Sequence, residues 1–384
     1  MPLTVSNTRA GRYVKQPTGY SSYKPNGLPP LPALEVDAEM LALLSKADQC
    51  LGRLDGVTQT LPNPDLFVSM YVKKEALLSS QIEGTQASLI EVIAAEDNQS
   101  KDVQEVTNYV HAMNHGLNRL SELPLSLRLL REIHRELLRS GRGSDRSPGE
   151  FRTTQNWIGA PGCKLSGAVF VPPCPDDMLD ALGDLERYFY EDESLPPLIK
   201  IALIHAQFET IHPFVDGNGR VGRLLITFWL CQQQILSQPL LYLSYFFKRN
   251  RTAYYEKLMD VRERGMWEEW VKFFLHGIIE ISQESIASAQ QIDALRESLT
   301  SRVDELDGVS VANARRLLDL LFITPQVTRS SVADALGISR PTAGALIGKF
   351  ADELSILEDA SPGAARNKTY LFKEYMEILE VGTE

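Results

Sequence analysis

Apolar residues return every three to four positions along most of this chain. The pattern runs from Leu34 to Leu54, from Ser88 to Leu138 and from Pro197 to Ile211, and it returns in a long amphipathic stretch over residues 265–305. That spacing is the period of an α-helix that packs one face, or its whole surface, against a core. The pattern therefore predicts a mainly α protein.

Two regions lack the helical period. Residues 153–175 contain two β-prone runs, around Gln155–Ile158 and Ala168–Val171, on either side of a Gly/Pro turn, and this predicts a small β-hairpin. Residues 1–35 are rich in Pro, Gly, Tyr and Ser, which predicts an extended arm that lies over the main domain.

The C-terminal residues have a pattern of their own. A helix is predicted over Ala312–Phe322, and two further helices with Ser or Thr caps follow on either side of a turn at Gly337. This spacing resembles a helix-turn-helix, and the run at 366–372 is the candidate wing strand. From Val309 to Glu384, eight Lys/Arg stand against ten Asp/Glu, which gives no basic footprint for DNA. Dimerisation or target docking is therefore favoured for this winged helix-turn-helix, with DNA contact as the alternative.

Composition places the chain among ordinary globular proteins. Of its 384 residues, 43% are hydrophobic and 23% are charged, and the formal net charge is −11, which argues against non-specific binding to nucleic acid or anionic membranes. No run of about eighteen apolar residues predicts a membrane span, and the N-terminus has no apolar signal core. The four cysteines have no C-x-x-C spacing, so reduced thiols and a cytoplasmic location are expected.

The residues from Ile211 to Arg223 carry the chemistry of the chain, and they read I-H-P-F-V-D-G-N-G-R-V-G-R. Pro213 ends the apolar helix before it, since proline cannot donate to the preceding turn, and a second apolar helical pattern begins at Val221. The segment Gly217-Asn218-Gly219 is therefore expected at a helix N-terminus. Free N–H groups and the positive end of the helix dipole attract an anion there.

The side chains of this stretch suit phosphoryl chemistry. The glycines admit a phosphate close to the backbone, Asn218 adds an amide donor, and Arg220 and Arg223 can each fork onto phosphate oxygens. Asp216 is the one carboxylate and the expected Mg²⁺ ligand, because Mg²⁺ beside phosphates takes one or two carboxylates plus substrate oxygens. Histidine titrates near neutrality, so His212 is expected to take a proton from an attacking hydroxyl.

The motif H-P-F-V-D-G-N-G-R-V-G-R resembles the signature of the Fic family, H-P-F-x-[DE]-G-N-G-R-x-x-R, at every specified position. The resemblance implies a Fic-type helical core and transfer of AMP from ATP to a Ser, Thr or Tyr hydroxyl of a target protein. It implies that His212 is the general base, Asp216 the Mg²⁺ ligand and Arg223 the holder of the γ-phosphate. The residues implied to bind the nucleotide through this loop are Gly217, Asn218, Gly219, Arg220, Val221, Gly222 and Arg223.

A second motif lies on a helix predicted over residues 68–84, with Gly84 as its C-cap. Glu83 stands in the last turn, where the negative end of the dipole disfavours an anion and a cation partner is needed. Ser79-x-x-x-Glu83-Gly84 is similar to the inhibitory-helix motif [ST]-x-x-x-E-[GN] of autoinhibited Fic proteins. The resemblance implies that Glu83, within the motif that Ser79 begins, pairs with Arg223 and blocks productive seating of the γ-phosphate.

The resemblance also places residues around the nucleotide and the target. The hairpin at 153–175 would be a flap that holds the target by main-chain pairing, with Val169 and Phe170 near the nucleotide; an ordinary hairpin that plugs the helical domain is the alternative. Tyr254 and Tyr255 lie where Fic proteins surround the adenine ring, and a role in the core is the alternative for this aromatic pair.

These patterns predict three parts: an N-terminal arm over 1–45, a Fic catalytic domain over 46–305 and a winged-helix domain over 306–384. The expected partners are ATP, Mg²⁺ and a target protein, and the helix at 265–305 either links domains or packs a homodimer. Three alternatives to autoinhibited AMP transfer stay open. They are removal of AMP from a modified protein with Glu83 orienting a water, transfer from another nucleotide donor, and DNA-binding regulation through the C-terminal domain.

Overall fold

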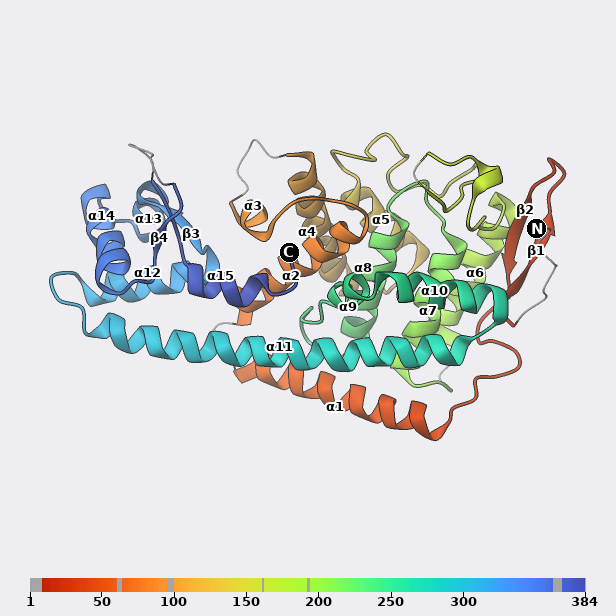
Figure 1. The fold of residues 1–384 in the computed structure, drawn as a ribbon, viewed down its shortest axis with the longest axis horizontal. Coiled ribbons are helices and arrows are strands. Elements are labelled where there is room, and N and C mark those ends of the chain that lie inside the picture. The colour runs from red at the N-terminus through yellow and green to blue at the C-terminus, as the bar shows by residue number, and fades with distance from the viewer. Residues whose placement is uncertain are drawn as a thin grey trace.

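The computed structural model describes residues 9–60, 64–94, 100–160, 162–191, 194–361 and 368–383. It is mainly helical, which confirms the fold class expected from the hydrophobic period (Figure 1). The helices before the C-terminal unit are α1 (Ala38–Thr60), α2 (Pro64–Ile82), α3 (Leu89–Ile93), α4 (Lys101–Leu120), α5 (Leu127–Leu137), α6 (Pro175–Glu191), α7 (Pro197–Ile211), α8 (Asn218–Gln232), α9 (Ser244–Arg249), α10 (Arg251–Arg264) and α11 (Trp267–Asp304).

Helix α7 lies at the centre of the core. Every side chain from Leu198 to Ile211 is buried, because apolar residues occupy all faces of the helix instead of one stripe. Helix α8 packs against α7 and is buried from Arg220 to Leu230. The loop over residues 212–217 thus connects two helices that are fixed in the core.

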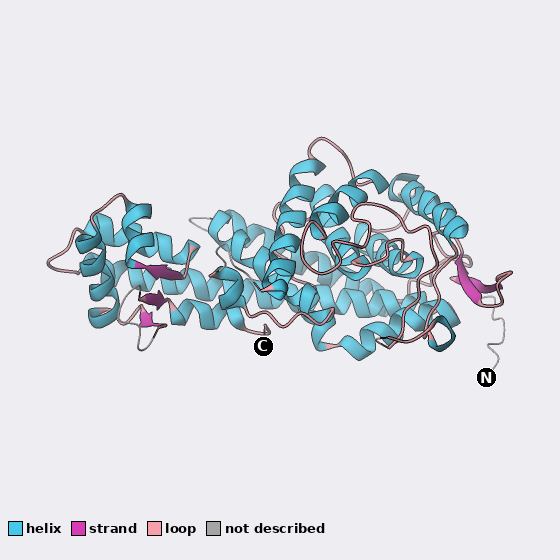
Figure 2. Ribbon diagram, turned by 90° about the horizontal axis from the view of Figure 1, so that it is seen from above, coloured by secondary structure: helices cyan, strands magenta, loops and turns pink. Residues whose placement is uncertain are grey.

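Helix α11 is 38 residues long and runs along the molecule, with α1 beside it (Figure 1). At 1.5 Å per residue it spans about 57 Å. The single long helix predicted over residues 265–305 is confirmed. It reaches from the main part of the protein to the C-terminal unit, which lies at the opposite end of the molecule from the N-terminal strands (Figure 2).

The N-terminal arm contains a hairpin that the sequence pattern did not predict. Strands β1 (Gly11–Lys15) and β2 (Ser21–Pro25) pair antiparallel. Tyr23 is buried against Phe170, with ring centres 5.6 Å apart, and its N–H donates to the carbonyl of Val171 at 2.9 Å. The arm therefore covers the main domain, as expected, but it does so with regular strands that are too short to show a period in the sequence.

The hairpin predicted at 153–175 is mostly irregular. One antiparallel bridge joins Ile158 to Phe170, with Ile158 N–H donating to Phe170 O at 2.8 Å and Phe170 N–H donating to Ile158 O at 3.1 Å. A 3₁₀ turn follows over Leu165–Gly167. The two extended strands do not form, and Pro172 and Pro173 supply no N–H donors with which to lengthen the ladder. We call residues 153–175 the flap.

The C-terminal unit combines small helices with a three-stranded antiparallel sheet in the order β3-β5-β4. Gly337 in the left-handed conformation and Ser339, which accepts from Thr342 N–H, form the predicted helix end and helix start. Strand β5 lies in the predicted wing run, of which residues 366 and 367 lie outside the described residues. The winged-helix assignment stays a prediction. The elements are α12 (Val311–Ile323), β3 (Gln326–Thr328), α13 (Arg329–Leu336), α14 (Arg340–Gly348), β4 (Glu358–Asp359), β5 (Thr369–Leu371) and α15 (Lys373–Glu380).

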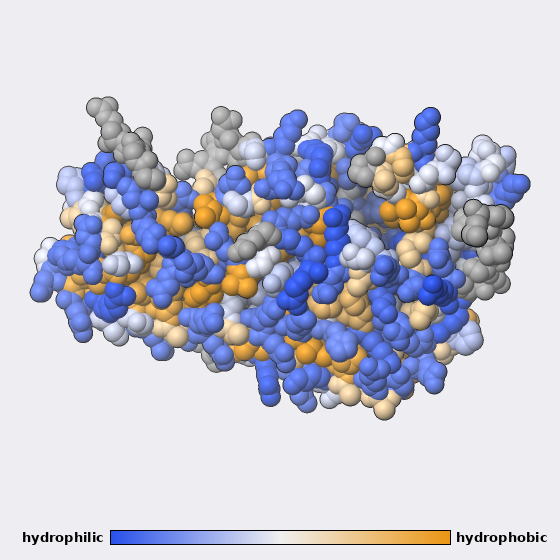
Figure 3. Space-filling view, viewed as in Figure 1, coloured by the Kyte–Doolittle hydropathy of each residue, from blue (hydrophilic) through white to orange (hydrophobic). Residues whose placement is uncertain are grey.

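The surface is predominantly hydrophilic on the face shown in Figure 3, where hydrophobic side chains form smaller patches between charged ones. Within the described ranges, no helix combines the length and the apolarity that crossing a membrane requires. The long apolar runs of the sequence are used for the interior, as in α7.

Candidate functional site

The loop between α7 and α8 turns on two residues with left-handed backbone. His212 follows α7 with φ 51 and ψ 60, and Gly217 precedes α8 with φ 80. Glycine adopts this conformation freely, whereas it costs a residue with a side chain about 1–2 kcal/mol. The backbone of His212 therefore depends on the contacts around it.

Arg152, which directly precedes the flap, and Asn156 of the flap supply such contacts. Arg152 Nε and Asn156 Nδ2 both donate to the carbonyl of His212, at 3.0 and 3.2 Å. Arg152 Nη2 also donates to Pro173 O at 2.6 Å. Burial lowers the pKa of Arg152 to about 10, so the guanidinium stays charged at neutral pH. These two residues, which the motifs did not point to, tie the flap to the loop.

His134 of α5 fixes the loop from the other side. Its Nδ1 accepts from Gly149 N–H at 2.8 Å, so the ring proton lies on Nε2, which donates to the carbonyl of Asp216 at 3.0 Å. The ring stacks on Phe214 with centres 3.8 Å apart. Burial lowers the pKa of His134 to about 4, which keeps this neutral tautomer at physiological pH. The residue braces the loop without taking part in proton transfer.

The side chain of Asn218 also braces the loop. Its Oδ1 accepts from Phe214 N–H at 2.7 Å, and its Nδ2 donates to Phe214 O at 2.8 Å. The sequence predicted that this amide donates to a phosphate. In the structure both of its polar atoms bond the main chain four residues earlier, because the buried loop needs its own N–H and C=O groups satisfied.

The imidazole of His212 is poised as a neutral base. Its Nδ1 is buried and has no hydrogen-bond partner among the described residues. Burial, together with the nearby charges of Arg262 and Arg152, lowers the pKa of His212 to about 3. The ring is therefore neutral at physiological pH, which is the form that a general base requires.

The N-terminus of α8 faces Glu83, which follows the last residue of α2. A Cβ atom on Gly219 would lie 2.3 Å from Glu83 Oε1 and 3.0 Å from Arg223 Nη1. The Glu83 carboxylate thus lies over the first turn of α8, whose free N–H groups and dipole attract an anion. It stands at the helix terminus predicted to receive a phosphate.

Arg223 binds both residues of the second motif. Its Nη2 donates to Glu83 Oε1 at 2.7 Å, and its Nε donates to Ser79 Oγ at 2.7 Å. Burial opposes the charge on Glu83, but Arg223 outweighs burial and the pKa of Glu83 is lowered overall. In the same way, Glu83 outweighs burial and raises the pKa of Arg223. Both groups are charged at neutral pH, and the expected ion pair is present.

Arg220 is buried between two carboxylates. Its Nη1 lies 3.9 Å from Glu105 Oε2, and its Nη2 lies 3.5 Å from Asp216 Oδ1. Its Nε and Nη1 have no hydrogen-bond partner in the part of the chain that the structure describes. A buried guanidinium with unused donors is costly unless a ligand completes it, and phosphate oxygens are such a ligand. Glu105 of α4, which also accepts from Thr85 Oγ1 at 2.8 Å, was not singled out from the sequence.

Asp216 is the acidic group of the loop. Its Oδ1 accepts from Gly217 N–H at 2.6 Å, and Gly143 lies close to its other oxygen, where a Cβ would be 2.9 Å from Oδ2. The side chain is 39% exposed. The described residues contain no cluster of three or more His, Cys, Asp or Glu that could hold a metal ion. One partly exposed carboxylate fits a Mg²⁺ that takes its other ligands from phosphates and water.

Comparison with known proteins places this loop in a family. A model described as "Fic/DOC family N-terminal" matches residues 41–118, and a model described as "Fic/DOC family" matches residues 124–230, which include the whole motif. Residues 41–118 thus match a Fic N-terminal domain and residues 124–230 match a Fic domain. Glu83 lies in the first of these two regions and Arg223 in the second, so their ion pair joins the Fic N-terminal region to the Fic domain.

Relatives extend this finding over parts of the chain. Proteins named "Protein adenylyltransferase Fic" from Drosophila grimshawi and Drosophila melanogaster are 33% and 32% identical over 143 residues. This match covers 36% of the present chain, which spans only 27% of the length of those relatives. The crystal structure of a Fic family protein from Desulfovibrio desulfuricans G20 has a TM-score of 0.58 at 21% identity, covering 88% of this chain and 97% of that one. That likeness shows a shared fold.

Of the two flap residues that were expected near the nucleotide, one is exposed and one is buried. Val169 is 66% exposed. Phe170 is buried, with the Arg262 guanidinium 4.1 Å from its ring centre and Tyr23 on another side. Phe170 therefore anchors the flap in the core, because the N-terminal hairpin and α10 close over it. Its expected place near the nucleotide stays a prediction.

The two tyrosines of α10 also differ in exposure. Tyr254 is buried, and its hydroxyl donates to His205 Nε2 at 2.9 Å, because His205 Nδ1 carries the proton that it donates to Gly222 O at 2.9 Å. Tyr255 is 40% exposed. The burial of Tyr254 agrees with the alternative of a role in the core, and Tyr255 is the tyrosine of this pair with an exposed ring. The adenine contact of the pair stays a prediction.

Two further residues of the motif that were expected to bind the nucleotide lie where helices pack. Val221 is fully buried on the inner face of α8, because it is two residues from both Gly219 and Arg223 and the helical period turns it away from them. A Cβ on Gly222 would lie 2.3 Å from Oε1 of Glu209, so Gly222 admits this buried carboxyl group between α7 and α8. Burial raises the pKa of Glu209 to about 7. The nucleotide contacts of Val221 and Gly222 stay a prediction.

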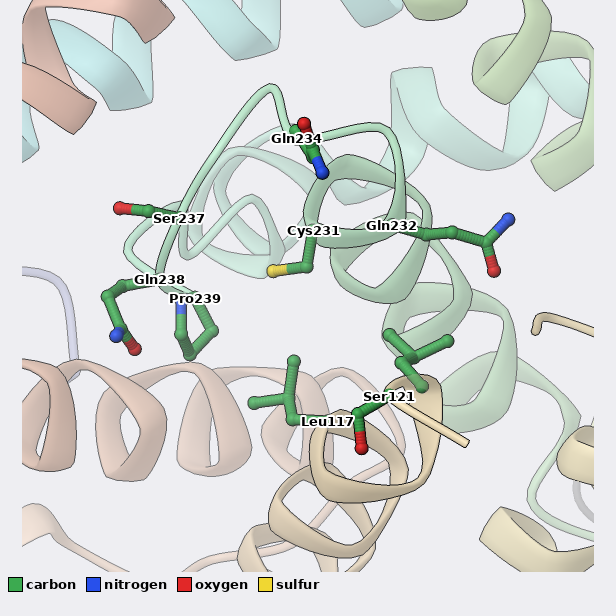
Figure 4. Close-up of a pocket in the computed structure, with 9 residues that line it drawn as sticks. Leu117, Ser121, Cys231, Gln232, Gln234, Ser237, Gln238 and Pro239 are labelled. Carbon is green, nitrogen blue, oxygen red and sulfur yellow. The ribbon is translucent and has the colours of Figure 1, made fainter. Parts of the chain in front are cut away.

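A separate pocket opens at the other end of α8 (Figure 4). Its lining is uncharged and includes Leu117, Ser121, Cys231, Gln232 and Pro239. Since the 15 residues of α8 rise about 22 Å, this pocket lies a helix length away from the charged groups. It is not part of the candidate site.

Proposed function

We propose that this Fic protein is a protein adenylyltransferase, which transfers AMP from ATP to a hydroxyl group of a target protein, and that Glu83 restrains it. One observation carries the proposal: a neutral buried base, His212, leads by one loop into a helix N-terminus that carries two buried arginines. A base beside a phosphate site is the arrangement that in-line phosphoryl chemistry needs. The name of the Drosophila relatives agrees with this activity.

The proposed reaction uses each group of the loop once. The target hydroxyl gives its proton to the imidazole of His212 while its oxygen attacks the α-phosphorus of ATP. The bond from that phosphorus to the bridging oxygen breaks, and pyrophosphate leaves. The N–H groups at the start of α8 and the unused donors of Arg220 hold the phosphate oxygens as charge develops on them. Mg²⁺ on Asp216 and the ATP phosphates would neutralise part of that charge when bound.

The proposed restraint follows from competition for one site. Glu83 places its carboxylate over Gly219 and binds Arg223 at 2.7 Å. A γ-phosphate that uses Arg223 needs the same donors and the same space. Two anions cannot share them, since like charges at this distance repel strongly. ATP therefore seats productively only when Glu83 has left.

The proposed target surface is the flap and the loop it touches. Asn156 Nδ2 donates to Phe214 O at 3.0 Å, which brings the neighbouring Trp157 and Val215 to the same region. Both are exposed, as is Val169. We place an extended target segment along these apolar side chains, where main-chain pairing with the flap orders it.

The position of the transferred label tests the function. Purified Glu83→Gly protein is incubated with Mg²⁺, a lysate, and ATP labelled at either the α- or the γ-phosphate. Adenylyl transfer labels protein from the α-position only. Label from the γ-position would show phosphoryl transfer, and transfer from other nucleoside triphosphates but not ATP would show a different donor. Loss of AMP from a labelled target on adding wild-type protein would instead support the reverse reaction.

A further inference from the structure

The last turn of α2 has two faces that contact different parts of the protein. Ser79 and Glu83 are four residues apart and face Arg223 of α8. Gln81 is two residues from each, and residues two apart on a helix point about 200° away from one another. Gln81 therefore lies on the face turned from the Fic domain loop.

That outer face is held by the C-terminal tail. Gln81 Nε2 donates to Thr383 O at 2.9 Å, and Gln81 Oε1 accepts from Lys248 Nζ at 2.8 Å. Lys248 Nζ also donates to Gly382 O at 3.4 Å. One side chain of α2 thus bonds both the tail and the lysine that bonds the tail.

The tail fits its place closely. Gly382 has φ 83, and a Cβ at this position would lie 2.2 Å from Cε2 of Tyr245. Thr383 is only 7% exposed, and its Oγ1 donates to Glu380 O at 2.9 Å. The tail is therefore packed and hydrogen-bonded against α2 and α9 as a specific contact.

The contact belongs to the C-terminal unit. Helices α12 and α15 both pack on α2, and α15 leads the chain from the small sheet back to α2 near the middle of the molecule (Figure 1). Helix α2 thus lies between the phosphate site on one side and the C-terminal unit on the other.

We propose that Gly382 and Thr383 are a latch that holds the end of α2, and with it Glu83, in the restraining position. The inference rests on the proposed restraint by Glu83. Displacing the tail removes the hydrogen bond from Gln81 Nε2 to Thr383 O and the bond from Lys248 Nζ to Gly382 O. This loss shifts the population towards a state in which Glu83 has left Arg223. The C-terminal unit then controls the Fic domain through Gly382 and Thr383. The coupling is reciprocal. The factor by which release of the tail strengthens productive ATP binding is also the factor by which bound ATP weakens the tail contact.

Two variants break the latch from opposite sides. Gly382→Leu drives a side chain into Tyr245 without changing α2, and Gln81→Ala removes the amide without changing the tail. Val381→Ala is the matched control, because Val381 is 57% exposed. Hydrogen exchange of residues 79–85 is measured by mass spectrometry on the full chain, alongside label transfer from ATP. The amides of Glu83, Gly84 and Thr85, which bond to Ser80 and Gln81, report the last turn of α2.

The latch predicts that both variants speed exchange of this turn and raise label transfer about five- to tenfold, the range of an ordinary coupling between sites. Val381→Ala changes neither. Exchange that stays at the wild-type rate in both variants, with the tail itself released, overturns the latch. The exchange measurement does not depend on catalysis. If Glu83→Gly transfers no label while exchange of residues 79–85 speeds up in the two latch variants, the proposed adenylyl transfer is wrong and the latch on α2 is right.

Discussion

Glu83 and Arg223 form an ion pair over the first turn of α8, with Glu83 Oε1 2.7 Å from Arg223 Nη2. The Arg223 side chain is buried, whereas the Glu83 side chain is 33% exposed. The carboxylate therefore borders solvent, whereas the guanidinium is enclosed by the protein. In the proposed restraint, Glu83 is the partner that leaves and Arg223 is the group that then meets a phosphate.

Ser79→Ala tests the support behind this ion pair. The change removes the hydrogen bond from Arg223 Nε, worth about 1 kcal/mol, and leaves Glu83 itself in place. Arg223 is then less firmly directed at Glu83, and we expect transfer activity to rise about fivefold, well short of the rise caused by Glu83→Gly. Initial rates with labelled ATP measure it. A rate at or below that of the wild type would show that Ser79 supports the nucleotide and not the restraint.

Gly219→Ala separates the restraint from the site it covers. Its Cβ would lie 2.3 Å from Glu83 Oε1 and 3.0 Å from Arg223 Nη1, so it displaces Glu83 but fills the phosphate position as well. We expect no gain in transfer and an ATP affinity at least tenfold weaker, measured by calorimetry in the Glu83→Gly background. Activation by Gly219→Ala alone would contradict the shared site.

Gly222→Ala tests the packing between α7 and α8. The new methyl would meet the buried Glu209 carboxyl at 2.3 Å, and overpacking of this kind costs about 1–3 kcal/mol. Gly183→Ala in α6 is the matched control, because nothing lies within 4 Å of its Cβ position, and there alanine stabilises a helix by about 0.5–1 kcal/mol. Urea unfolding of both variants measures the difference. Equal stabilities would contradict the close approach.

Tyr254→Phe tests whether Tyr254 serves the core or the nucleotide. The change leaves the buried acceptor His205 Nε2 without its donor, which we expect to cost about 1–3 kcal/mol of stability. A role in the core alone predicts that KM for ATP stays within about twofold of wild type. Stability and KM are both measured in the Glu83→Gly background. A large rise in KM without loss of stability would return Tyr254 to the adenine site.

The pH dependence of kcat/KM follows from His212. Burial lowers the pKa of this ring to about 3, and only the neutral ring accepts a proton, so lowering the pKa extends activity towards acid. The acid limb for the Glu83→Gly enzyme is expected well below the ordinary histidine value of about 6.5. Circular dichroism at each pH confirms that the protein is folded. Half-maximal kcat/KM near or above that ordinary value would contradict a buried neutral base.

Much of the site could be predicted because its determinants are local. The turn at Pro213, the glycines before α8 and the Ser79–Glu83 spacing each depend on a few neighbouring residues. The partners Arg152, His134 and Glu105 could not be found in this way, since they reach the loop from distant segments through tertiary packing. The fold was predictable for the same reason, as the helical period is local. The strands of the N-terminal hairpin were missed because they are too short to show a period in the sequence.

The buried residues of the site segments share one physical feature. Phe170, Tyr254 and Val221 lie in these segments, but their side-chain direction is set by burial, and sequence position alone does not reveal it. Each faces the core while a neighbour, such as Val169 or Tyr255, faces outward. A period of two or of 3.6 residues separates the two classes only when the register of the element is known.

The most direct test compares transfer of the α-phosphate label from ATP, with Mg²⁺, to protein in a lysate by wild type, Glu83→Gly, and Glu83→Gly combined with His212→Ala. The account predicts weak labelling by the wild type, strong labelling by Glu83→Gly and none by the double variant, all three being equally folded. Equal labelling by wild type and Glu83→Gly would contradict restraint by the carboxylate over α8. Labelling that survives His212→Ala would contradict the assignment of the base.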